Sequence, residues 1–144
     1  MNTFFAELAV ATNFSFLRGA SHAEELVAAA AAQELDAIGV ADRNTMAGVV
    51  RIHTEAKTLK LKPLIGCRIE TVQGLAFLAY PRNRAGYGQL CRLISAGRMR
   101  TLDGEWQAKG ACDISLAMLA GHCLLYTSDA ADDPPRIDLG VHRT

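Results

Sequence analysis

Short apolar runs and helical repeats alternate along the first half of the chain. The runs 4–10 and 37–40 are too short to be helices of their own, and each predicts a strand buried in a parallel sheet. Between them, the alanine-rich stretch 23–34 carries an apolar stripe at helical spacing, which predicts a helix. Ser21 and Glu24 match the S-x-x-E capping box, so we expect this helix to begin at Ser21.

The same alternation continues further along the chain. The pattern predicts a helix over 46–57, strands over 64–69 and 75–80, a helix through Tyr87, Leu90 and Ile94, a polar and mobile segment over 97–110, and a short helix over 116–120. Strands that alternate with helices indicate βαβ units, hence an α/β protein with a mainly parallel sheet and right-handed crossovers. The pattern alone leaves open whether the sheet is flat or closes into a barrel.

The loop after the apolar run 37–41 is the first place to look for function, because ligands in α/β folds lie beyond the carboxyl ends of strands. It reads Asp42, Arg43, Asn44. A hydrolytic metal site needs His, Asp, Glu or Cys at several strand ends, whereas here Arg43 follows Asp42 and the third strand supplies Arg68. We therefore expect Asp42 to cap the next helix or to pair with Arg43 or Arg68 rather than to bind a metal.

Other chemistry-bearing residues give weaker signals. We expect His22 to be a surface or loop-packing histidine and His53 to be packed or half-exposed, rather than ligands. No G-x-S-x-G nucleophile elbow, Cys/His pair or glycine-rich phosphate loop is present. Five arginines form a basic run with Tyr80 and Tyr87 interleaved, which suits phosphate contacts, a solvated face, or a contact with another part of a longer protein; they are Arg82, Arg84, Arg92, Arg98 and Arg100.

Composition narrows the class of protein without choosing a ligand. The chain has 144 residues, enough for one ordinary domain, and half of them are apolar, as in globular proteins. The formal net charge is zero, so charge alone favours neither nucleic acid nor membrane as a partner. No apolar run is long enough for a membrane span and no signal segment opens the chain. We expect a cytoplasmic protein that has no contact with a membrane.

The last stretch, 123–144, has a different character. The run Cys123 to Asp133 resembles the translation of a transposase-type sequencing adapter, and Pro134 and Pro135 follow it. We therefore expect residues 1–122 to be the native domain, truncated near His122, and residues 123–144 to be a disordered, non-native tail. A genuine acidic tail is the alternative.

Several motifs together resemble the start of bacterial C-family DNA polymerases. In order and spacing they cover nearly all of 4–122: Phe5-Ala6-Glu7-Leu8, Asn13-Phe14-Ser15-Phe16-Leu17, Gly19-Ala20-Ser21-His22, Ile38-Gly39-Val40-Ala41-Asp42-Arg43-Asn44, Ala47-Gly48-Val49-Val50-Arg51 and Ala79-Tyr80-Pro81. The resemblance is strongest to the error-prone, damage-response type of polymerase III alpha subunit. Such chains begin with a PHP (polymerase and histidinol phosphatase) domain, a distorted β/α barrel, so the resemblance implies roughly the first half of such a barrel.

The resemblance also implies a degenerate metal site. Metal-binding PHP domains carry ligands at positions that correspond to Ala9, Ala11, Asp42, Arg43 and Arg68, and only Asp42 keeps a ligand-type side chain. We therefore expect no catalytic residue, cofactor or metal in this segment.

Three functions stay open at this point. The leading one is a non-catalytic scaffold at the N-terminus of an error-prone DNA polymerase, a nucleotidyltransferase that uses Mg²⁺, DNA and deoxynucleotides in damage-induced synthesis and repair. The rest of the polymerase chain and damage-response accessory proteins would be its partners. The alternatives are a metal-dependent phosphoesterase or 3'-5' exonuclease of the PHP family, and a free-standing interaction module.

Overall fold

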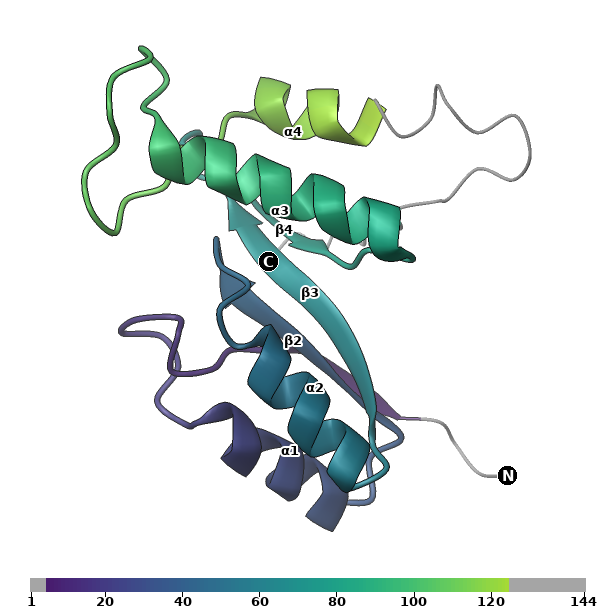
Figure 1. Ribbon diagram of the computed structural model, residues 1–144. Helices are drawn as coiled ribbons and strands as arrows, with labels where there is room; N and C mark the ends of the chain where they lie inside the picture. Colours follow the sequence, from purple (N-terminus) through teal and green to yellow (C-terminus); the bar gives the residue numbers. More distant parts are fainter. Residues whose placement is uncertain (1–4, 125–144) are drawn as a thin grey trace. The chain divides into compact units, whose positions relative to one another are not determined.

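The computed structural model describes residues 5–124, coloured along the chain in Figure 1. The elements, in chain order, are β1 (Ala6–Val10), α1 (Ala23–Ala32), β2 (Ala37–Arg43), α2 (Val49–Thr58), β3 (Lys62–Glu70), β4 (Ala76–Ala79), α3 (Arg84–Met99) and α4 (Leu116–Leu124). The chain divides into two compact units between Arg68 and Ile69. None of the helices in this range is long and apolar enough to cross a membrane.

The first unit is a parallel sheet with both crossover helices on one face. β1 pairs with β2 and β2 pairs with β3, each in parallel, and Figure 1 shows α1 and α2 side by side on this sheet. Right-handed crossovers that advance by one strand each time leave their helices on the same face, as in a β/α barrel. A doubly wound sheet would alternate them between the two faces, so this topology favours the barrel type.

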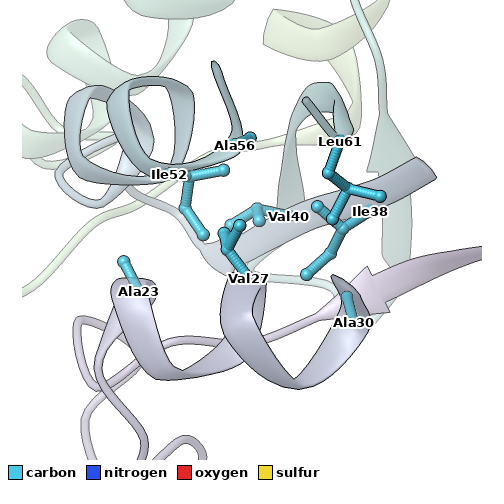
Figure 2. Packing of buried hydrophobic residues seen from close by; sticks show 8 residues of the cluster. All are labelled: Ala23, Val27, Ala30, Ile38, Val40, Ile52, Ala56 and Leu61. Atoms are coloured by element: carbon cyan, nitrogen blue, oxygen red, sulfur yellow. The ribbon is translucent and has the colours of Figure 1, made fainter. Parts of the chain in front are cut away.

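The core of this unit lies between the two helices and β2. Figure 2 shows its side chains pointing toward one another; they are Ala23, Val27, Ala30, Ile38, Val40, Ile52, Ala56 and Leu61, all buried. Alanines at the helix positions let the helices approach the sheet closely, while Ile and Val fill the space between them. The helical spacing predicted for both helices is thereby confirmed.

Two details of the first unit differ from the sequence prediction. β1 is parallel as predicted but mostly exposed, because it is the first strand in the sheet order and only Val10 packs against the core. The capping box is shifted by one residue: His22 is the N-cap, and its backbone N–H donates to Glu25 Oε2 at 2.9 Å. α1 ends at Ala32, close to the predicted end.

The second unit contains β4, which neighbours β3 in the strand order, and the helices α3 and α4. Leu90, Leu93 and Ile94 are the buried side chains of α3. Gly97 lets α3 approach the following segment, since a Cβ at this position would lie 2.8 Å from the carbonyl oxygen of Asp113.

Two predictions for the second unit need correction. The segment predicted as polar and mobile forms a hydrogen-bonded hairpin over 99–107, in which Gln107 N–H donates to Met99 O and Thr101 N–H donates to Glu105 O. The last helix is longer than predicted and runs to Leu124, so the predicted boundary after His122 falls inside a helix. The remainder of the predicted tail, 125–144, lies outside the described residues.

Candidate functional site

A buried carboxylate stands at the carboxyl end of β2, where the sequence pointed to function. Asp42 is 2 % exposed, and its two oxygens accept three hydrogen bonds. Oδ1 accepts from Thr12 N–H at 2.7 Å and from Ser15 Oγ at 2.6 Å, and Oδ2 accepts from Thr12 Oγ1 at 2.8 Å. All three donors are neutral, so this buried charge is stabilised by hydrogen bonds rather than by an opposite charge.

The loop between β1 and α1 brings these donors to Asp42. Ser15 N–H donates to Thr12 O, and Gly19 N–H donates to Ser15 O, so the loop turns tightly back on itself. Gly19 is required by this path, because a Cβ there would lie 2.2 Å from Thr12 O. Ser15 Oγ also accepts from the backbone N–H of Arg43 at 3.0 Å, which ties the loop to β2.

Two more residues close the site. Gly48 precedes α2, and a Cβ on it would lie 3.0 Å from Asp42 Oδ2 and 3.2 Å from Thr12 Oγ1. Cys67 on β3 is fully buried, and its thiol donates to the backbone oxygen of Asp42 at 3.2 Å. We call Thr12, Ser15, Asp42, Gly48 and Cys67 the Asp42 cluster.

The arginines predicted to pair with Asp42 belong to the other face of the sheet. Successive side chains of a strand point to opposite faces. Val40 lies in the core under the helices, so Asp42, two residues on, shares that face, whereas Arg43 points to the opposite one. Arg43 and Arg68 are register partners on adjacent strands and therefore lie side by side there.

The predicted roles of Asp42 are therefore wrong in two respects. Its hydrogen bonds come from Thr12 and Ser15 instead of Arg43 or Arg68, because strand alternation separates the carboxylate from the guanidinium groups. It does not cap α2 either, since the N-cap of that helix is Gly48. Arg43 and Arg68 themselves lie at the same end of the sheet, as their register shows.

The remaining predicted site residues contribute no ligand set. Ala9 is exposed and Ala11 is half-buried. His22 is an exposed residue whose Nδ1 lies 3.2 Å from Asn13 Nδ2, and His53 is exposed, more so than predicted. Within residues 5–124, no three His, Cys, Asp or Glu side chains are grouped so that they could hold a metal ion.

Sequence reasoning missed the partners of Asp42. Thr12 and Ser15 look like ordinary loop residues, and they reach Asp42 across about 30 positions of the chain. The one available signal was the alternation of polar and apolar residues in the loop, Asn13 and Ser15 with Phe14 and Phe16, which indicates that one side of the loop is turned inward.

The donor chemistry of the cluster does not fit a metal centre. A divalent ion needs several converging carboxylates, imidazoles or thiolates with free lone pairs. Here both oxygens of Asp42 are already engaged, and the neighbouring hydroxyls are donating their protons to it. The face that carries Arg43 and Arg68 offers fixed positive charge instead, since arginine does not lose its proton in proteins.

The chain belongs to the PHP domain family, whose model matches residues 7–128. It is 47% identical over 120 residues to an error-prone DNA polymerase of Brucella abortus, a match that covers 80% of this chain and 11% of the relative. It is 51% identical over 102 residues to an error-prone DNA polymerase of Caulobacter vibrioides, with 70% of this chain and 9% of the relative covered. The chain thus spans about a tenth of the length of these relatives.

A solved structure shows the same fold. An amidohydrolase from Chromobacterium violaceum, with bound sulfate and no metal, superposes with a TM-score of 0.56 at 18% sequence identity, covering 65% of this chain and 33% of that one. The α/β class and the partial PHP-type barrel implied by the resemblance are confirmed, and the chain corresponds to the PHP region of proteins named error-prone DNA polymerase.

Proposed function

We propose that this chain is the PHP portion of an error-prone, DNA-directed DNA polymerase and serves there as a non-catalytic scaffold. Nucleotidyl transfer with Mg²⁺, DNA and deoxynucleotides belongs, in this proposal, to the part of the relatives that the chain does not cover. Damage-induced synthesis and repair are the processes in which such an enzyme would act, with accessory proteins of the damage response as further partners.

The observation that carries the scaffold role is the engagement of Asp42. A carboxylate that must bind a metal or accept a proton needs a free lone pair directed at the ligand. Asp42 instead joins the β1–α1 loop to β2 through hydrogen bonds from Thr12 and Ser15. Such a cluster fixes two chain segments to each other, which is a structural task.

The alternative is a metal-dependent phosphoesterase or 3'-5' exonuclease, because the PHP family match is compatible with it. In that case the ligands would have to come from the face of Ala9, Arg43 and Arg68. The guanidinium groups of Arg43, which is exposed, and Arg68, which is half-buried, carry a fixed positive charge and would disfavour a divalent cation there.

Metal content and hydrolysis distinguish the two functions. A polymerase carrying this N-terminal segment is purified without chelators, its zinc, manganese and iron are measured by mass spectrometry, and hydrolysis of a phosphodiester substrate is followed. The test variant is Asp42→Asn, which keeps the shape of the side chain, and the control is Asp36→Asn on the surface of the same unit.

We expect no stoichiometric zinc, manganese or iron, and no hydrolysis that responds to Asp42→Asn. Polymerase activity should persist in the control and fall in the variant only as far as folding is lost. Stoichiometric metal that disappears together with hydrolysis in Asp42→Asn would overturn the scaffold role in favour of the phosphoesterase.

A further inference from the structure

The second unit carries an unbalanced stretch of positive charge. Between Thr71 and Leu102 the sequence has five arginines and no Asp, Glu or Lys, although the whole chain is neutral. All five arginines are exposed. Tyr87 adds no negative charge near neutral pH, because the ordinary pKa of a tyrosine hydroxyl is already far above 7; burial and a hydrogen bond with Cys91 raise the pKa of Tyr87 further.

Three of these arginines share one side of α3. At about 100° per residue, Arg84, Arg92 and Arg98 fall within an arc of roughly 120°. Arg84 and Arg92 lie away from the buried side chains of α3, and Arg98 lies at the edge of the buried side, next to Ile94. A rise of about 1.5 Å per residue separates them by roughly 12 and 9 Å along the axis. We call these three residues the basic face.

The absence of a side chain at Gly88 leaves room on α3 for the guanidinium group of Arg92. Its guanidinium nitrogen Nη1 lies 3.6 Å from the place that a Cβ of Gly88 would occupy, and the three nearest neighbours of that place are all atoms of Arg92. Arg92 Nε donates to Gln89 Oε1 at 3.4 Å. A glycine inside a helix is unfavourable, and here it leaves the guanidinium lying along an open helix surface.

An exposed aromatic ring follows the basic face. The hairpin 99–107 holds Trp106 against Arg100, whose guanidinium carbon lies 3.6 Å from the ring centroid. Arg100 Nη1 also donates to Gly104 O at 3.2 Å. Trp106 nevertheless stays 69 % exposed, so the ring is held in place by its arginine without being buried.

From this arrangement we infer that the basic face and Trp106 bind single-stranded DNA. Arginines at intervals along the helix contact phosphates spaced along the backbone, and the exposed indole provides a surface on which a base stacks. A duplex offers no unstacked base, and an acidic peptide offers no base at all, so Trp106 selects a single strand. The choice of DNA over RNA rests on the proposed function, whereas the charge and the stacking do not.

The protein provides its own probe, because Trp106 is the only tryptophan in the sequence. The 144-residue chain, checked for helicity by circular dichroism, is titrated with a thymidine oligonucleotide at low salt while tryptophan emission is followed. Stacking should quench the emission. For about three neutralised phosphates the logarithm of the affinity should fall with the logarithm of the salt concentration with a slope near −2.

Matched variants test whether binding depends on the basic face or only on the number of positive charges in the chain. Arg84→Ala combined with Arg92→Ala should weaken binding about tenfold or more and flatten the salt slope by about 1.4. Lys57→Ala combined with Lys62→Ala removes the same charge from exposed positions of the first unit and should change neither. With a labelled oligonucleotide, Trp106→Ala should lose about tenfold in affinity, and Trp106→Phe should restore part of it.

Several results would overturn the inference. Equal losses of affinity in the arginine and lysine double variants would do so, and so would binding that leaves the tryptophan emission unquenched. Tighter binding of duplex than of single strand, or a preference for RNA of the same sequence, would also contradict it. So would displacement of the oligonucleotide by polyglutamate as effective as displacement by DNA. The metal analysis of the polymerase does not depend on any of these, so failure here leaves the scaffold role standing.

A second measurement covers the case in which the isolated chain does not fold. In a longer polymerase that carries this chain at its N-terminus, a photo-reactive phenylalanine analogue replaces Arg92. We expect it to crosslink to single-stranded DNA, while the same analogue in place of Lys57 does not. No crosslink from position 92, or equal crosslinking from both positions, contradicts the inference.

Discussion

The Asp42 cluster and the basic face use charge in opposite ways. Asp42 is a single buried charge, and each of its hydrogen bonds comes from a neutral group of the β1–α1 loop. Arg84 and Arg92 are exposed charges on a helix whose packing is carried by its other side. A buried charge whose partners lie in a distant loop contributes to folding, whereas exposed charges of one sign remain available to a ligand.

Removing the buried carboxylate should have the largest effect. Asp42→Ala leaves three buried donors without an acceptor, on Thr12 and Ser15. At about 1 kcal/mol or more for each orphaned donor, the free energy of unfolding should fall by about 3 kcal/mol or more. Urea denaturation followed by circular dichroism measures it.

The control for this prediction is Asp36→Ala in the same unit. Asp36 accepts one exposed hydrogen bond, from Phe5 N–H at 2.9 Å, so its loss should change the free energy of unfolding by no more than about 0.5 kcal/mol. Similar losses in the free energy of unfolding for the two variants would show that the buried hydrogen bonds of Asp42 contribute no more to stability than the exposed one of Asp36.

Crowding the loop that carries the donors should have the next largest effect. In Gly19→Ala the new methyl group would lie 2.2 Å from Thr12 O and 2.7 Å from Ala11 O, so the backbone has to shift, at a cost of about 1–3 kcal/mol. Thermal unfolding measures the loss.

Gly121 provides the contrasting substitution. It lies inside α4 and a Cβ there would meet nothing within 4 Å, so Gly121→Ala should raise the free energy of unfolding by up to about 1 kcal/mol. A tolerated Gly19→Ala would mean that the loop can hold Thr12 and Ser15 in place by another path.

A single donor of the cluster can be removed almost without changing its shape. Thr12→Val replaces the hydroxyl that donates to Asp42 Oδ2 by a methyl group and should cost about 1–2 kcal/mol. Thr12→Ser keeps the hydroxyl and should cost less. Chemical denaturation of both variants compares them, and equal costs would mean that the hydroxyl of Thr12 contributes no more to stability than its methyl group does.

The sequence predicted elements well where the pattern is local. β2 is a short apolar run, and the helical stripe of α2 through Ile52 and Ala56 is buried as expected. The shift of the capping box from Ser21 to His22 shows how little sequence distinguishes neighbouring helix starts. The alternation predicted the parallel pairing of β1, β2 and β3, and the helix positions in the structure decided between the open sheet and the barrel.

The contacts of the Asp42 cluster could not be predicted because they are not local. Thr12 and Ser15 reach Asp42 from another loop, and strand alternation, which puts Arg43 on the opposite face, decides which neighbours Asp42 can have. In the hairpin 99–107 the polar composition hid the stacking of Arg100 on Trp106. In both places local composition indicated a loop; contacts from a distant segment define the first, and contacts across a short hairpin define the second.

Removing the exposed charges should have the smallest effect on stability. In the double variant Arg84→Ala, Arg92→Ala, the side chains that are lost lie away from the buried side of α3. Arg92 gives up only an exposed hydrogen bond to Gln89, and alanine favours the helix at least as well as arginine does. The free energy of unfolding should therefore stay within about 0.5 kcal/mol of the original, even though two charges are removed where Asp42→Ala removes one. Denaturation and oligonucleotide titration on the same samples test this directly, since binding should fall while stability holds. A loss of stability comparable to that of Asp42→Ala would show that these arginines hold the fold together, and the contrast between the two regions would disappear.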